Sequence, residues 1–128
     1  MDHIFNENQP IYQQIIQRIE AKIMRGEYQP GTKLPSVVEG AMLYKVNHNT
    51  MARVYSELVR AEILVVKRGE GTFVTEDKTV LSKMAGELRD SLIQDFTNEI
   101  KALGFSITDI LPLLLDSSET NPGEKGGK

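Results

Sequence analysis

Apolar residues recur at every third or fourth position over residues 10–26, and this spacing predicts an amphipathic helix. Pro10 suits the first turn of such a helix, and Gly26 suits its carboxyl-terminal end. The predicted apolar stripe consists of Ile11, Tyr12, Ile15, Ile16, Ile19 and Ile23. The first element of the chain is therefore expected to be a helix of four turns.

A turn and two further helices are expected next. Pro30 and Gly31 predict the turn, and Ser36 and Glu39 have the spacing of a capping box that opens a short helix ending near Tyr44. The buried positions expected in that helix are Val38, Ala41 and Met42. After a break at residues 45–46, Asn47 is a candidate N-cap for a third helix over residues 47–61. Its apolar stripe consists of Met51, Val54, Tyr55 and Leu58.

The periodicity changes after the third helix. Residues 64–75 contain two short β-rich runs joined by a turn with Gly69 and Gly71, which predicts a β-hairpin. Three helices followed by a hairpin are the element order of a winged helix-turn-helix, in which the third helix enters the major groove of DNA.

A long helix is predicted from Lys78 to Gly104, followed by a shorter one that Ser106 and Asp109 open as a capping box, with Phe105 and Ile110 as a hydrophobic staple. Pro112 is expected to kink or shorten the last helix. The apolar stripes of the long helix and the shorter one together consist of Leu81, Met84, Ala85, Leu88, Leu92, Phe96, Ile100, Leu103, Ile107, Leu111, Leu114 and Leu115. This surface exceeds what one short helix can cover, so we expect dimerisation; a fold-back onto the amino-terminal domain is the alternative.

The expected architecture is mainly α with a small β-hairpin. A winged helix-turn-helix domain occupies residues 1–76, a helical dimerisation region residues 77–116, and a polar, Gly-rich tail expected to be disordered residues 117–128. The residues expected to make the dimer contacts are Leu81, Met84, Leu88, Leu92, Phe96, Ile100, Leu103, Leu111, Leu114 and Leu115.

Composition removes several classes of function. The 128 residues include no cysteine, and His3 and His48 lack a metal-ligand spacing, so we expect no zinc site and no thiol nucleophile. The chain also lacks a Ser-His-acid set with plausible spacing. We therefore expect neither a cofactor nor an enzymatic activity. The first ten residues are polar and acidic, unlike a signal peptide, and the longest apolar runs, residues 63–66 and 110–115, are too short to span a bilayer. We expect a cytoplasmic protein without a membrane partner.

Net charge alone does not indicate a nucleic-acid partner, since it is −3. Residues 1–76 carry nine Lys and Arg against nine Asp and Glu, so any DNA surface depends on where the cations are placed. On the third helix, the face opposite the apolar stripe carries His48, Asn49, Ala52, Arg53 and Ser56. Arginine pairs with guanine and asparagine with adenine in the major groove, although an ordinary solvated helix face is polar too.

The predicted hairpin supplies two more cations, Lys67 and Arg68, beside a Gly-Glu-Gly turn. Such a turn lets the backbone approach a phosphate or the minor groove. An ordinary exposed β-turn is the alternative interpretation, and Glu70 at the tip favours it because a carboxylate repels phosphate.

The segment LPSVVEGAMLYKVNHNTMARVYSELVRAEILVVKRGEGTFV closely resembles the DNA-binding domain of the GntR family of bacterial regulators, and the resemblance extends over residues 9–75. Its anchors are PGTKLPS, NTMARVYSEL and RGEGTFV. With only about fifty residues after the hairpin, the chain looks like the YtrA-type subfamily, in which two carboxyl-terminal helices dimerise and no large effector domain is present.

The resemblance implies roles for individual residues. Ser36 and Thr50 would hold phosphates at helix amino termini. Asn49 and Arg53 would contact DNA from the recognition helix, with His48 beside them and Lys45 adding charge from the preceding turn. The wing would consist of Arg68, Gly69, Gly71 and Thr72, next to Lys67, which the hairpin pattern already selects.

Four departures from the family pattern qualify these roles. The family usually has arginine at the positions of Val38 and Glu70, and glycine at those of Lys45 and Glu62. Fewer phosphate contacts predict a shallower salt dependence than a typical family member shows, and a narrower set of sites.

The resulting hypothesis is a transcription regulator, most simply a repressor, that binds double-stranded operator DNA with a pseudopalindromic sequence as a homodimer. The alternative is an interaction module that keeps the fold and has lost operator affinity. The sequence assigns no small-molecule effector, and the short carboxyl-terminal helices enclose little volume for one.

Overall fold

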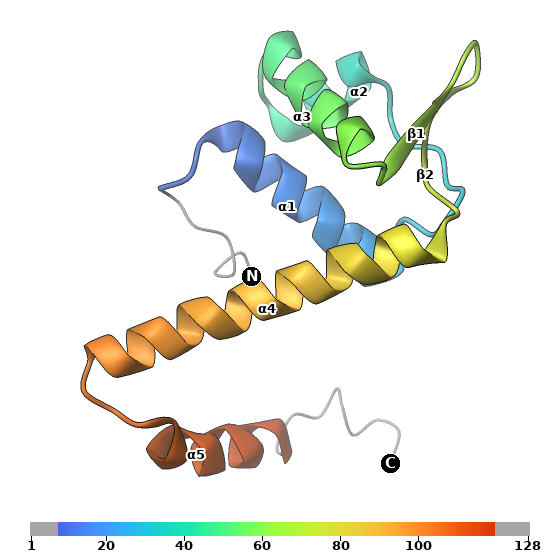
Figure 1. The fold of residues 1–128 in the computed structure, drawn as a ribbon. Helices are drawn as coiled ribbons and strands as arrows, with labels where there is room; N and C mark the ends of the chain where they lie inside the picture. Colours follow the sequence, from blue (N-terminus) through green and yellow to red (C-terminus); the bar gives the residue numbers. More distant parts are fainter. Residues whose placement is uncertain (1–7, 120–128) are drawn as a thin grey trace. The chain divides into compact units, whose positions relative to one another are not determined.

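The computed structural model describes residues 8–119, which form five α-helices and one antiparallel hairpin (Figure 1). The elements are α1 (Ile11–Met24), α2 (Val37–Tyr44), α3 (His48–Arg60), β1 (Leu64–Lys67), β2 (Gly71–Val74), α4 (Lys78–Ala102) and α5 (Ile107–Glu119). They belong to two compact units that divide after Ala85, within α4. The predicted class, helical with a small hairpin, is confirmed.

The first unit is built around α3, which packs extensively against α1, α2 and β1. In Figure 1 α1, in blue, α3, in green, and the hairpin surround this core. The side chains that fill it include Ile15, Ile19, Ile23, Leu34, Met51, Val54, Leu58, Leu64 and Val74. The periodicity correctly predicted all four buried positions of α3 and all three buried positions of α1.

Ile11 does not join the buried stripe of α1, since 51% of its surface is exposed. It is the first residue of the helix, and helical side chains tilt toward the amino terminus. Ile11 therefore projects beyond the turns that pack against α3. The prediction that it belongs to the core is wrong.

The predicted capping box at the start of α2 is confirmed. Ser36 Oγ accepts a hydrogen bond from the Glu39 backbone N–H at 3.1 Å, and the Glu39 Oε1 accepts one from the Ser36 N–H at 2.9 Å. Buried positions in α2 were predicted less well. Val38 and Met42 are 56% and 74% exposed, contrary to prediction, while Gly40 and Ala41 are buried.

Close packing of α2 on α3 explains that reversal. A Cβ atom placed on Gly40 would lie 3.1 Å from Met51 Cε, so the two helices approach where α2 carries its smallest residues. The bulky side chains of Val38 and Met42 then turn outward. A periodicity argument favours large apolar residues for the core, and it missed a contact made by a glycine.

Two helices of the first unit end in a left-handed residue that is not glycine. Lys45 (φ 57°) follows α2 and Glu62 (φ 69°) follows α3. After each of these residues the chain forms the long hydrogen bond of a Schellman motif: Val46 N–H donates to Ala41 O at 3.0 Å, and Ile63 N–H donates to Leu58 O at 3.0 Å. These are the two positions at which the family resemblance gives glycine.

Glu62→Gly is therefore expected to stabilise the protein by about 0.5–1 kcal/mol, because glycine adopts positive φ without a Cβ clash. Equilibrium unfolding in urea measures the change. The matched control is Glu62→Ala, which removes the same carboxylate and keeps the strained Cβ, so it should give no comparable gain. An equal gain from both substitutions would attribute the effect to charge.

A third, strand-like segment, which the sequence did not predict, pairs with the hairpin. The register pairs Leu64 with Val74 and Lys67 with Gly71. On the other edge of β2, Leu34 N–H donates to Thr72 O at 2.8 Å and Val74 N–H donates to Thr32 O at 2.9 Å. The segment after the Pro30-Gly31 turn thus anchors the hairpin to the core. Pro35 limits this segment to a few residues, too few to show the alternation of apolar and polar positions that predicts a strand.

The second unit contains the later part of α4 and all of α5. Gly104 (φ 88°) ends α4 with a Schellman pair, and Phe105 N–H donates to Ile100 O at 3.0 Å. The capping box predicted for α5 is confirmed, since Ser106 and Asp109 exchange two hydrogen bonds of 3.3 Å.

The helix α5 continues past Pro112 to Glu119 and so includes residues 117–119, the first three residues of the predicted tail. A proline removes one helical donor, but residues 117–119 contain no glycine or proline that would end the helix. The rest of the predicted tail, residues 120–128, lies outside the described residues.

Many of the predicted dimerisation residues are exposed in the single chain. Leu92, Phe96, Leu103, Leu111, Leu114 and Leu115 are between 43% and 72% exposed, Leu81 and Leu88 are half-buried, and Met84 and Ile100 are buried. Within the described part of the chain, no helix is both long and apolar enough to cross a membrane.

Candidate nucleic-acid interface

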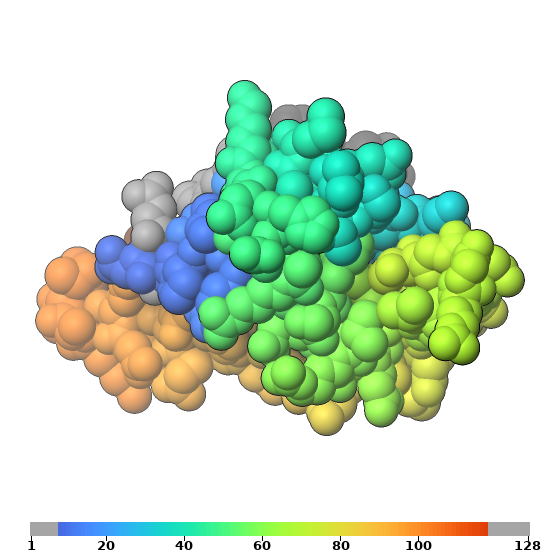
Figure 2. Space-filling model, turned by 90° about the horizontal axis from the view of Figure 1, so that it is seen from above, coloured from blue at the N-terminus to red at the C-terminus, as the bar shows by residue number. Residues whose placement is uncertain are grey.

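The outer face of α3 presents the polar side chains that the sequence analysis selected. His48, Asn49, Arg53 and Ser56 are exposed, and Ala52 between them is half-buried. Figure 2 shows this side of the molecule, with α3 in green between α1 in blue and the hairpin in yellow-green. Donors and acceptors suited to base edges are thus gathered on one exposed helix face.

The amino terminus of α3 has features that favour binding of an anion. Asn47 caps it by accepting a hydrogen bond from the Thr50 N–H at 3.1 Å. The N–H groups of His48 and Asn49 lie in the first turn, where a helix supplies no acceptor, and the helix dipole is positive there. The first turn of α3 carries no acidic residue. Thr50 is half-buried, and Lys45 is exposed in the turn just before this end.

The amino terminus of α2 is less favourable to a phosphate. Glu39, which completes the capping box, brings a carboxylate to the same helix end. The Ser36 Oγ accepts the Glu39 N–H and keeps its own hydrogen as a donor. A phosphate contact by Ser36 would therefore rest on that one hydroxyl group, against the repulsion of a neighbouring carboxylate.

The wing is a tight turn that depends on two glycines. Gly69 (φ 77°) and Gly71 (φ 130°) adopt conformations that side chains disfavour, and Glu70 N–H donates to Lys67 O at 2.8 Å. The Lys67 Nζ lies 4.7 Å from the centre of the Phe73 ring. Arg68 and Glu70 are exposed at the tip, and Thr72 is half-buried. The geometry leaves the backbone of the turn open to an approaching phosphate.

Lys33 is a third cation at the wing, and its position in the sequence did not predict this placement. Its Cε atom lies 2.7 Å from the point that a Gly71 Cβ would occupy, so its side chain crosses the strand where β2 carries no side chain. Lys33 also forms an isolated bridge with Phe73. Only the pairing of residues 32–34 with β2 reveals this placement, because Lys33 precedes the wing by more than thirty residues.

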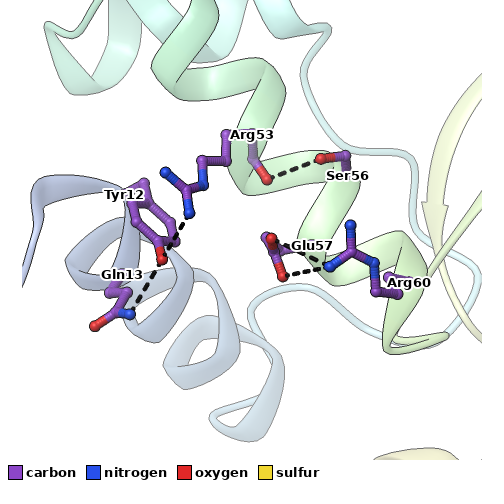
Figure 3. A network of polar contacts seen from close by, with 6 residues as sticks. All are labelled: Tyr12, Gln13, Arg53, Ser56, Glu57 and Arg60. Atoms are coloured by element: carbon purple, nitrogen blue, oxygen red, sulfur yellow. Dashed lines mark hydrogen bonds and ion pairs between the residues drawn. The ribbon is translucent and has the colours of Figure 1, made fainter.

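Tyr12 of α1 contacts the outer polar face of α3, the recognition face, although its spacing predicts a place in the apolar stripe of α1. The Arg53 Cζ lies 3.7 Å from the centre of the Tyr12 ring, and the Arg53 Nη2 donates a hydrogen bond to the Tyr12 Oη at 3.1 Å (Figure 3). Gln13 Nε2 donates to the same oxygen at 3.2 Å. The one arginine of the recognition face is therefore held by α1.

Tyr55 connects the recognition helix to the loop that leads into α2. Its hydroxyl donates a hydrogen bond of 2.6 Å to the carbonyl oxygen of Pro35, just before the capping box at Ser36. Burial raises the pKa of the Tyr55 phenol well above its ordinary value. The phenol therefore stays protonated, and able to donate this bond, at neutral pH.

Tyr55→Phe is expected to destabilise the fold by about 1–2 kcal/mol, because it leaves the Pro35 carbonyl without its donor. Urea unfolding measures the loss. Tyr28→Phe is the control, since it removes a partly buried tyrosine hydroxyl for which no bond to this loop is seen. A loss for Tyr55→Phe no larger than for the control would contradict a structural role for the bond.

Comparison with known proteins identifies relatives of the whole arrangement. The family described as "Bacterial regulatory proteins, gntR family" matches residues 11–74, which contain α1 to β2. The chain is 39% identical over 111 residues to the uncharacterized HTH-type transcriptional regulator YhcF of Bacillus subtilis, covering 87% of this chain and 92% of that protein. It is 45% identical over 73 residues to the HTH-type transcriptional repressor YtrA of Bacillus subtilis, covering 56% of each chain.

A solved structure extends the similarity to the helices after the hairpin. A GntR family transcriptional regulator from Listeria monocytogenes superposes with a TM-score of 0.80 at 35% identity, covering 88% of this chain and 98% of that one. These relatives are named as regulators and not as enzymes. They confirm the resemblance, including the YtrA-type relatives, that the anchors PGTKLPS, NTMARVYSEL and RGEGTFV indicated.

Proposed function

Because the chain belongs to the GntR family of bacterial regulatory proteins, we propose that it represses transcription as a homodimer on a pseudopalindromic operator. The recognition helix α3 enters the major groove, and the wing contacts the backbone or the minor groove. The regulator acts on chromosomal DNA in the cytoplasm.

The observation that carries this proposal is the outer face of α3. Asn49 and Arg53 are exposed one turn apart on it, beside an amino terminus that holds no acidic residue. In a helix-turn-helix made by α2 and α3, the amino-terminal part of its second helix, α3, contacts base edges in the major groove. Lys33, Lys67 and Arg68 add three cations at the wing, opposed there by Glu70.

The apolar surface of α4 and α5 supports the homodimer. Six of the ten residues predicted for dimerisation are exposed in the single chain, from Leu92 to Leu115. A two-fold dimer would remove this surface from water and would set two recognition helices against two half-sites. Both consequences follow from one contact, which favours a homodimer over a different protein partner.

Phosphate binding is expected to be modest. Val38 is apolar where the family usually has arginine, Glu70 is acidic where it usually has arginine, and Glu39 places a carboxylate at the α2 amino terminus. Fewer neutralised phosphates give a smaller dependence of affinity on salt. Specificity then depends on base contacts and on the pairing of two half-sites.

A selection of duplexes from a random library by the purified full-length chain, at low salt, tests the proposal. Enrichment of a sequence with two inverted half-sites about one helical turn apart is the expected result. No enrichment of any sequence would overturn the operator-binding function. It would instead favour an interaction module, which the exposed Val38 and Met42 on α2 suggest as the second candidate.

A further inference from the structure

We propose that Tyr12 is a positioning residue for DNA recognition, which holds the guanidinium of Arg53 in the orientation that reads a base. The inference rests on the proposed function, because it presumes that Arg53 faces the major groove. Tyr12 itself belongs to the first turn of α1, outside the helix-turn-helix, and acts through Arg53.

The contact fixes the guanidinium in two ways. The Arg53 Cζ lies 3.7 Å from the centre of the Tyr12 ring, a cation–π contact that fixes the position of the guanidinium against the ring. The hydrogen bond from Nη2 to the Tyr12 Oη, 3.1 Å long, fixes which nitrogen of the group points toward the phenol. Gln13 donates to the same oxygen at 3.2 Å and so restrains the phenol from its other side (Figure 3).

The fork of Arg53 remains available for a base. A guanidinium has five N–H donors, and this contact uses one of them. Nη2 keeps a second hydrogen and Nη1 keeps both of its own, which is the pair of donors that binds guanine O6 and N7. The contact with Tyr12 leaves these donors for another acceptor, consistent with the exposure of Arg53.

The choice of a neutral partner preserves the charge of Arg53. Glu57 stands four residues after it, the spacing of a helical ion pair, but binds Arg60 through both carboxylate oxygens at 3.4 Å (Figure 3). Among residues 8–119, the ion pairs Arg25–Glu27, Arg60–Glu57 and Arg89–Asp90 do not include Arg53. A phenol orients the cation without cancelling the positive potential that attracts DNA.

A side chain ordered before binding loses less conformational entropy on binding, and for a long side chain this preorganisation corresponds to about a 3- to 10-fold gain in affinity. The contact would have the opposite effect if Arg53 had to leave Tyr12 in order to reach the base. It would then compete with DNA, and removing it would tighten binding.

A double-mutant cycle separates these cases. Tyr12→Leu, Arg53→Ala and the double variant are titrated by fluorescence anisotropy against the duplex that the wild-type protein selects from a random library. We expect Tyr12→Leu to weaken binding about 3- to 10-fold with Arg53 present and to have no further effect in the Arg53→Ala background. Tyr12→Phe, which keeps the ring and loses the hydroxyl, should lose less. Thermal unfolding of each variant verifies that it is folded.

Three outcomes would overturn the inference. An equal loss in both backgrounds would show that Tyr12 acts on the fold or touches DNA itself, and tighter binding would show competition. No effect of Tyr12→Leu while Arg53→Ala weakens binding would leave the proposed function standing without a role for Tyr12. An unchanged affinity of Arg53→Ala would instead remove Arg53, and with it the positioning role, from the interface.

A measurement without DNA reports on the contact itself. Protons of the Arg53 side chain over the Tyr12 ring should resonate upfield in the NMR spectrum of the free protein, and the shift should vanish in Tyr12→Leu. Ordinary shifts in the wild-type protein would show that the stack is not populated in solution, which would refute preorganisation whatever the binding data show.

Discussion

Replacing Leu92 and Phe96 together with glutamine is expected to convert the proposed homodimer to monomers and to weaken binding to the selected duplex by at least about 100-fold. Both side chains are large, apolar and exposed on α4 of the single chain. Glutamine removes their apolar area, adds no charge and is a good helix former, so α4 itself should persist. A monomer holds one half-site at a time and loses the gain that two linked recognition helices provide.

Sedimentation velocity measures the oligomeric state, and anisotropy titration measures the affinity. Met24→Gln is the matched control, because Met24 is also a large, half-exposed apolar residue but lies at the end of α1. It should leave both the dimer and the affinity unchanged. A double variant that remains dimeric would place the interface elsewhere, and a monomeric wild-type protein would refute the homodimer.

Sequence reasoning predicted the helices well where one face meets a large core. The stripe of α3 was correct at Met51, Val54, Tyr55 and Leu58, because a helix surrounded by α1, α2 and β1 must bury a continuous face. The caps at Ser36, Asn47 and Ser106 were also correct, since each depends only on neighbours within three residues. Local chemistry and strong periodicity are legible in a single chain.

The errors occurred where the structure depends on contacts distant in sequence. The burial of Gly40 against Met51 reversed the expected faces of α2, and the pairing of residues 32–34 with β2 brought Lys33 to the wing. Tyr12 reaches Arg53 across 41 positions of sequence. A tyrosine at helical spacing is equally consistent with a core position, so no signal in the chain separated its two roles.

Lys45 and Glu62 connect the family resemblance to a physical cost. The resemblance gives glycine at both positions, and the structure shows a left-handed backbone at both. An L-residue in that conformation costs about 1–2 kcal/mol. At Lys45 the cost accompanies a cation in the turn before the recognition helix, near the candidate interface. At Glu62 no contact with the candidate interface offsets it, which is why Glu62 is the position to test by substitution with glycine.

Arg53→Ala is expected to weaken binding to the selected duplex by about 1–3 kcal/mol and to relax the preference at one base position of each half-site. Arg53 is exposed and contacts Tyr12, so the substitution should lower the free energy of unfolding by no more than about 1 kcal/mol. A repeated selection with the variant, compared with that of the wild-type protein, identifies the relaxed position. A loss that is uniform over all sequences would instead assign Arg53 to a phosphate.

Arg53→Lys distinguishes the two assignments further, because lysine keeps the charge and lacks the planar fork. A base contact predicts that Arg53→Lys binds nearly as weakly as Arg53→Ala, with a similar relaxation of the preference. A phosphate contact predicts that lysine restores most of the affinity and most of the salt dependence. Arg60→Ala is the control on the same helix, since Arg60 is engaged by Glu57, and it should change affinity little. Wild-type affinity in Arg53→Ala would exclude this residue from the interface and would leave Asn49 as the main candidate for base recognition on α3.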